Sequence, residues 1–166
     1  MALIITPGAL DAEAYIDVEY ADDYIEKHVL RNESWFALPE KRKEVAIRAA
    51  TLSLDRNLRW TGTPTYSTQA LQHPRKNIKD KFGNDFPEDE ILPEVKQANA
   101  ELALWLVNNV PSAELANFGY IKVGGSISFK INDGTVFKSI PSEIFRIVDL
   151  WAVRRDAISV VRLVRA

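Results

Sequence analysis

Residues 93–109 read Pro-Glu-Val-Lys-Gln-Ala-Asn-Ala-Glu-Leu-Ala-Leu-Trp-Leu-Val-Asn-Asn, and this stretch decides the fold. Pro93 suits the first position of a helix, because its missing N–H would have no intrahelical partner there. Apolar side chains then recur at three- and four-residue intervals, which places them on one helix face: Val95, Ala98, Leu102, Trp105 and Leu106. Pro111 disfavours continuation beyond Asn109. The stretch therefore predicts a central helix that packs against several other elements.

Two predicted helices precede the central one. Asp17 is placed to cap a helix that runs to about Leu30, and acidic residues in its first turn suit the helix dipole. Pro39 opens a longer helix that ends near Leu58. The side predicted to face the core carries Val45, Ala46, Ala49 and Leu52. The side predicted to face water carries Lys41, Arg42, Lys43, Arg48 and Arg56.

The connection over residues 61–92 is long for a compact domain, and such connections usually carry structure or a task. We expect one short helix near Ser67 to Leu71, followed by an exposed loop that contains Lys76, Lys79 and Lys81. Acidic residues at 85–90 are interpreted as a capping and solubilising cluster before Pro93, because their spacing does not match a calcium loop.

After the central helix, the sequence predicts a β-hairpin over about residues 119–138 that projects from the helical body. Ile127, Phe129 and Ile131 alternate strictly with polar residues, and Asn-Asp-Gly at 132–134 supplies a turn. Residues 139–143, Ser-Ile-Pro-Ser-Glu, then open a last helix, whose apolar side carries Ile144, Ile147, Val148 and Trp151.

The chain ends in a segment rich in β-branched residues and arginine. We predict a helical domain over residues 1–152 and an extended docking tail over residues 153–166. A partner surface would bury the apolar side chains of this tail by strand addition or groove insertion. The alternative is that the tail returns as a strand on its own domain.

Composition bounds the function. The chain has 166 residues with 46% apolar and 27% charged residues, which fits one globular domain. It has no cysteine, no apolar run that predicts a membrane span, and no start typical of a secretory signal. We expect synthesis in a reducing cytoplasm.

The formal net charge of -2 is distributed unevenly along the sequence. Residues 1–40 are strongly acidic, whereas residues 41–60 are basic. Two interpretations remain open: the two segments are adjacent helices of one molecule, or they meet between neighbouring subunits. A nucleic-acid-binding domain would more often be basic overall.

Motifs that carry catalysis are absent from the sequence. There is no Walker loop, no Gly-x-Gly-x-x-Gly and no His-Glu-x-x-His, and only His28 and His73 could supply imidazole. Gly124-Gly125 is interpreted as a turn or bulge. We therefore predict a chain that is not an enzyme and that binds no cofactor or metal. Four tryptophans invite a base-stacking role, for which Trp60 is the best candidate, although most of the four are expected in the core.

The order of several short motifs resembles one family. These motifs are Ala21-Asp22-Asp23-Tyr24, Leu54-Asp55 followed by Trp60-Thr61-Gly62, Gln69-Ala70-Leu71 with Pro74-Arg75, and the segment Ile91-Leu92-Pro93 with Val95, Lys96, Ala98, Glu101, Leu102 and Ala103. They resemble phage proteins labelled DnaT-like single-stranded DNA-binding proteins, which are similar to the head-to-tail connector, or adaptor, proteins of tailed bacteriophages. The resemblance spans about residues 10–130. It implies a mainly α body with a projecting hairpin, assembled as a ring of twelve copies between the portal and the tail.

The first functional hypothesis is a structural virion protein of the neck. In this hypothesis the ring binds the portal, extends the DNA channel around packaged double-stranded DNA, and connects a tail or nozzle protein. The residues expected to dock on the portal are Arg154, Arg155, Ile158, Val160, Val161, Arg162, Leu163, Val164 and Arg165. The residues expected at subunit or tail contacts are Ile127, Phe129, Ile131, Asp22, Asp23, Lys41 and Arg42.

The second hypothesis is a phage replication accessory protein that binds single-stranded DNA. Its candidate contacts are Arg59, Trp60, Arg75 and Lys76, together with Lys41, Arg42 and Lys43. Binding that weakens steeply with salt would distinguish this hypothesis from the first.

Overall fold

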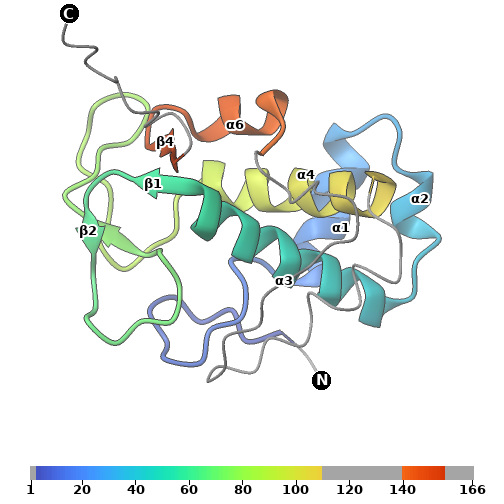
Figure 1. The fold of residues 1–166 in the computed structure, drawn as a ribbon, viewed down its shortest axis with the longest axis horizontal. Helices are drawn as coiled ribbons and strands as arrows, with labels where there is room; N and C mark the ends of the chain where they lie inside the picture. The colour runs from blue at the N-terminus through green and yellow to red at the C-terminus, as the bar shows by residue number, and fades with distance from the viewer. Residues whose placement is uncertain (1–2, 110–139, 156–166) are drawn as a thin grey trace, which may run out of the picture.

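The computed structural model describes residues 3–109 and 140–155, and over these residues the fold is mainly α (Figure 1). The helices are α1 (Val18–His28), α2 (Glu33–Phe36), α3 (Glu40–Asn57), α4 (Pro93–Asn109) and α6 (Ser142–Val148). Two small antiparallel sheets accompany them. One pairs β1 (Leu58–Trp60) with β4 (Ala152–Arg154), and the other pairs β2 (Thr63–Pro64) with β3 (Arg75–Lys76).

The central helix forms where the sequence predicts it. α4 contacts α1, α2, α3 and α6, and its buried side chains lie on more than one face. Asn99, the one polar residue among the buried side chains of α4, donates a hydrogen bond from Nδ2 to Thr51 Oγ1 of α3 at 2.8 Å. This bond satisfies the amide nitrogen in the contact between the two longest helices, whereas Oδ1 has no hydrogen-bond partner among the described residues.

The structure also confirms the predicted helix that begins after Asp17, which is α1. The Asp17 side chain accepts a hydrogen bond from the Tyr20 backbone N–H at 2.8 Å, and α1 ends at His28. Ala21 and Ile25, four residues apart, are its buried side chains. The last helix, α6, likewise buries Ile144 and Val148, as predicted.

The pattern of burial along α3 corrects the sequence analysis. Val45 and Leu52, predicted in the core, are only partly buried, whereas Ile47 and Leu54 are fully enclosed. The prediction that Lys43 faces water is wrong, since this residue is only 8% exposed. A carboxylate on α1 offsets the loss of hydration of its ammonium group, as described below.

The short helix predicted near Ser67 to Leu71 is not present, and Ser67 lies in a turn instead. The Gln69 side chain explains the difference. Its carbonyl oxygen accepts from the Tyr66 N–H at 3.0 Å, and its amide donates to Leu71 O and Pro74 O. Backbone groups that a helix would pair internally are thus bonded by one side chain.

The body of the protein continues to Arg155, beyond the predicted start of the tail at residue 153. β4 pairs with β1 in the register Leu58 to Arg154 and Trp60 to Ala152. The first part of the predicted tail therefore returns as a strand on its own domain. The predicted hairpin at about 119–138, with Ile127, Phe129 and Ile131, lies outside the described residues, as does the tail from residue 156.

Within the described ranges, no helix is both long and apolar enough to cross a membrane.

Candidate interaction surfaces

The Arg75 side chain fastens the long connection after β1. Its guanidinium donates to Thr61 O at 2.7 Å, to Gly62 O at 2.7 Å and to Gln72 O at 3.1 Å. The residue is 6% exposed, so these bonds are partly shielded from water. Because one planar group binds both sides of the loop, Arg75 acts as a structural clamp.

A buried polar cluster lies beside this clamp. The Tyr15 hydroxyl donates to Asp55 Oδ1, and Asp55 Oδ2 accepts from the Gln72 N–H at 3.1 Å. The His73 ring is 2% exposed and stands edge-on to Tyr15 and to Trp60, at centroid distances of 5.7 and 4.6 Å. Within the described part of the chain, neither ring nitrogen of His73 has a hydrogen-bond partner.

Burial shifts the pKa of Asp55 and the pKa of His73 in opposite directions. Loss of hydration raises the pKa of Asp55 to about 6, although the Tyr15 hydroxyl and the Gln72 N–H partly counteract it. Loss of hydration, together with the nearby Arg75 charge, lowers the pKa of His73 to about 3. The imidazole is therefore neutral near pH 7, and the cluster supports the fold.

The predicted nucleic-acid contacts fall into two groups, one buried and one on the surface. Trp60 is 6% exposed and Arg75 is a clamp, so neither can stack on a base or reach a phosphate. Arg59 is exposed and Lys76 is half-buried, and they remain on the surface. The prediction that Trp60 offers a stacking surface is wrong, because β1 turns its indole inward while it turns Arg59 outward.

Lys76 instead lines a polar cleft of about 560 Å³ with the half-exposed ring of Tyr66. The remaining walls come from the connection between β2 and β3: Pro64, Thr65, Ser67, Gln69, Ala70, Leu71 and Gln72. Gly8 packs under the Tyr66 ring, since a Cβ at this glycine would lie 2.4 Å from two ring carbons. An aromatic ring, a lysine and amide groups thus share one concavity.

The acidic and basic helices meet within one molecule. Lys43 Nζ lies 2.8 Å from Asp22 Oδ1, and the Trp35 indole N–H donates to the same oxygen at 2.6 Å. Asp23 pairs with Lys27 one turn along α1. Of the residues predicted at subunit contacts, Asp22 is therefore engaged inside the chain, while Lys41 and Arg42 are exposed.

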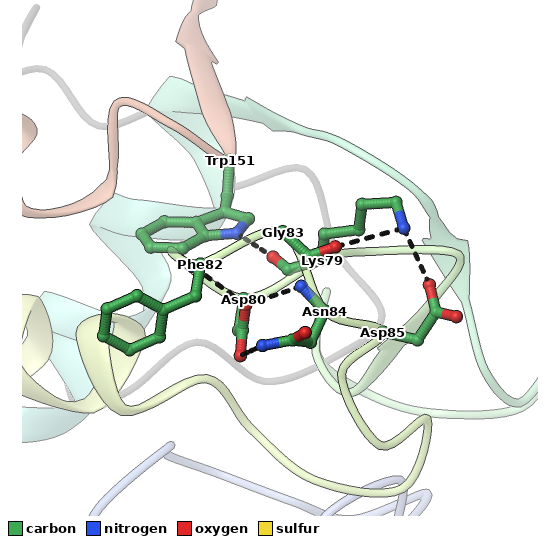
Figure 2. A network of polar contacts seen from close by, with 7 residues as sticks. All are labelled: Lys79, Asp80, Phe82, Gly83, Asn84, Asp85 and Trp151. Carbon is green, nitrogen blue, oxygen red and sulfur yellow. Dashed lines mark hydrogen bonds and ion pairs between the residues drawn. The ribbon is translucent and has the colours of Figure 1, made fainter.

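Hydrogen bonds and an ion pair order the exposed loop over residues 79–85 (Figure 2). Asp80 Oδ1 accepts from the Phe82 and Asn84 N–H groups at 2.8 Å each, and Lys79 Nζ binds Asp85 Oδ1 at 3.1 Å. The Trp151 indole N–H donates to Lys79 O at 2.6 Å and ties the loop to the body. This braced loop presents Phe82 with 79% of its surface exposed.

Other large apolar side chains are also exposed, at two ends of the body. At one end, Leu30 shortly before α2 is 97% exposed, and Phe36, the last residue of α2, is 43% exposed. Phe82, Leu150 and Val153 are 79%, 68% and 52% exposed, near β4. Figure 1 shows α2 at the opposite end of the long axis from β1 and β4. Such side chains are candidates for burial against another molecule.

An apolar cleft of about 300 Å³ lies between the end of α1, α4 and the start of α6. Its walls are Val29, Leu104, Trp105, Pro141 and Ile144, with Arg31, Glu101, Asn108 and Glu143 around them. The sequence periodicity predicts that these helix faces pack, but it does not reveal a gap between them.

Two residues predicted to dock on the portal contact their own domain. The Arg154 guanidinium lies over the Phe145 ring, 4.6 Å from its centroid. Arg155 Nε donates to Leu58 O at 3.1 Å, and its Nη2 donates to Asp55 O at 3.3 Å. The other portal-docking candidates, Ile158 to Arg165, lie outside the described residues.

Comparison with known proteins gives one match. A search of curated proteins and a search of solved structures each found no match. A family model described as "Putative DnaT-like ssDNA binding protein" matches residues 1–166, the whole chain. This chain therefore belongs to the DnaT-like ssDNA binding protein family.

Proposed function

We propose that this chain is a structural subunit of a phage neck, a head-to-tail adaptor that forms a ring beneath the portal. The observation that carries this proposal is the exposure of large apolar side chains at two opposite ends of the body, around α2 and around β4. Two different patches that complement each other make a heterologous contact, and such contacts close into a ring when the rotation between copies allows it. The resemblance of the ordered motifs to connector proteins supports the same proposal.

The proposed contact with the portal uses the chain beyond Arg155. This segment contains Ile158, Val160, Val161, Leu163 and Val164, which would gain burial on a partner. Since Arg154 and Arg155 contact their own domain, a test of the tail should spare both residues. Deletion of residues 156–166 is expected to leave a folded protein that no longer co-sediments with portal rings. Unchanged co-sedimentation would contradict this part of the proposal.

The second candidate function is binding of single-stranded DNA, and the family description favours it directly. The surface that fits it best is the cleft that holds Tyr66 and Lys76, because an aromatic face can stack on a base while a lysine binds phosphate. This candidate no longer depends on Trp60 or Arg75. The family description supports this second candidate rather than the adaptor, which rests on the surface and on the motif resemblance.

Filter binding of a labelled oligothymidine at two salt concentrations separates the candidates. A single-strand-binding protein would bind at low salt, lose affinity steeply as salt rises, and lose binding in Tyr66→Ala and Lys76→Gln. Lys27→Gln is the matched control, because it removes an exposed lysine of α1 that is not among the predicted nucleic-acid contacts. The adaptor proposal predicts weak binding that neither cleft substitution changes.

A further inference from the structure

The braced 79–85 loop is built to hold an exposed phenylalanine in one place. Three hydrogen bonds to Asp80 carboxylate oxygens, from the Phe82 and Asn84 N–H groups and the Asn84 side chain, fix the turn around the ring (Figure 2). The bond from Trp151 anchors its base. Because these bonds fix the backbone that carries Phe82, the loop loses little conformational entropy on binding, and the exposed ring is available for association.

The apolar cleft beside α6 matches this side chain in size. Its volume is about 300 Å³, and it is walled by Leu104, Trp105 and Ile144. A cavity of roughly 150 Å³ lined by apolar side chains can bind benzene. A phenyl ring therefore fits, with space left for the approach of the loop.

Charge also matches between the loop and the cleft. Glu101 and Glu143 place two carboxylates at the cleft, against one cation from Arg31. On the loop, Lys79 is paired with Asp85, whereas Lys81 Nζ lies over the Phe82 ring at 5.4 Å from its centroid. The phenylalanine thus carries a lysine with it, and that lysine would meet a predominantly acidic rim.

The loop and the cleft lie at different places on one chain. The loop is tied to Trp151, beyond the C-terminal end of α6, whereas the cleft lies at the N-terminal end of α6, near Pro141. A helix of this length separates its ends by about 10 Å, and none of residues 79–85 lines the cleft. Insertion of the loop would therefore use the cleft of a second copy.

We propose that Phe82 of one copy inserts into the α1–α4–α6 cleft of the next copy, and that Lys81 pairs with Glu143 across this contact. The inference rests on the proposed ring, for which it specifies the subunit interface. The contact is heterologous, because the knob and the cleft are different surfaces of the same chain, and repeated copies propagate it around an axis.

The absence of cysteine from the chain allows a direct test by disulfide formation. Lys81→Cys and Glu143→Cys are purified separately, mixed at equal concentration and oxidised. The expected product is a covalent dimer that contains one copy of each variant. A chain that carries both substitutions should give a ladder that ends in closed rings. Oxidation of Lys81→Cys alone is the control and should give little dimer.

Equilibrium sedimentation of the intact chain measures the energetics. Phe82→Ala should weaken self-association about 10- to 100-fold, the range expected for one buried aromatic anchor. Lys81→Glu and Glu143→Lys should each weaken it, and the double variant should recover association because the charges are exchanged. Leu10→Ala, which removes a side chain that is 76% exposed elsewhere, should have no effect.

The outcomes distinguish the interface from the ring itself. Rings in electron micrographs with no mixed disulfide, and with Phe82→Ala unchanged, would overturn the interface and leave the adaptor proposal standing. A cleft filled by a portal or tail peptide would give that result. Absence of any oligomer, alone or on the portal, would overturn both. A mixed dimer together with charge-swap recovery supports the interface whatever the number of subunits.

Discussion

Replacing Arg75 tests whether this residue, predicted from the sequence as a nucleic-acid contact, is instead the structural clamp of the long connection. Arg75→Met keeps an unbranched side chain in place of the arginine stem but removes all guanidinium donors. Three carbonyl oxygens, of Thr61, Gly62 and Gln72, then lose bonds of 2.7, 2.7 and 3.1 Å. A hydrogen bond to a charged group contributes about 1.5 to 3 kcal/mol, and water can reach part of this loop. We therefore expect the free energy of unfolding to fall by about 3 to 5 kcal/mol.

Urea unfolding followed by tryptophan fluorescence measures this loss, and Trp60 lies beside the clamp. With an m-value of about 2 kcal/mol/M, the midpoint should fall by about 2 M. Arg75→Lys is the matched control: it keeps the charge, but its single ammonium cannot reach all three carbonyls, so about half of the loss is expected. A midpoint within about 0.5 M of the unsubstituted protein in Arg75→Met would refute the clamp.

Three further predictions concern stability. The pKa of Asp55 is about 6 in the folded state, above its unfolded value, so the stability that Asp55 contributes is present at low pH and is lost as pH rises toward 6. The pKa of the buried His73 imidazole is about 3 in the folded state, so the stability that His73 contributes changes with pH in the opposite direction. These two pH dependences nearly cancel between pH 4 and pH 6 in the unsubstituted chain. Urea titrations at each pH should therefore show that Asp55→Asn loses about 2 kcal/mol of unfolding free energy between pH 6 and pH 4, relative to the unsubstituted chain. Parallel pH profiles of the two proteins would contradict the assignment. Asp22→Ala leaves the ammonium of Lys43 and the Trp35 indole N–H without their acceptor, so chemical denaturation should show a loss of about 2 to 4 kcal/mol, and a loss below about 0.5 kcal/mol would show that the pair contributes little. Gly62→Ala should cost about 2 kcal/mol or more in thermal unfolding, because Gly62 has φ +67° and an added Cβ would lie 2.4 Å from the Lys76 carbonyl oxygen; an unchanged Tm would contradict that strain.

The helices α1, α3, α4 and α6 could be predicted because their signals are local, whereas no local signal predicted the four-residue helix α2. Asp17 supplies a cap within three residues of the group it binds, and Pro93 marks the start of α4 at the residue where it begins. Apolar spacing then identifies the buried faces. These signals act within one or two turns of the chain, so the sequence alone contains them.

The strands and the polar interior could not be predicted in the same way. β1 and β4 are three residues long and lie more than ninety positions apart, so only the tertiary fold brings them together. The burial of Lys43 depends on Asp22 in another helix, and the clamp at Arg75 depends on carbonyls that precede it by thirteen and fourteen residues. No local pattern marks such partners.

The candidate surfaces could be predicted only in part, because they too depend on residues that are distant in the sequence. The sequence indicates an exposed loop around Lys76, Lys79 and Lys81. The structure confirms the exposure of Lys79 and Lys81, whereas Lys76 is half-buried. The sequence does not indicate that Asp80 and Trp151 brace this loop around Phe82. The same holds for the cleft that Tyr66 and Lys76 share.

The central claim is that this chain functions as an annular assembly joined to a portal. Electron microscopy of the purified full-length chain mixed with portal rings tests it most directly. If the chain is a neck adaptor, averaged images will show a second ring of this chain that lies on the portal axis and encloses a channel. Portal rings without added density, beside dispersed monomers of this chain, would contradict it.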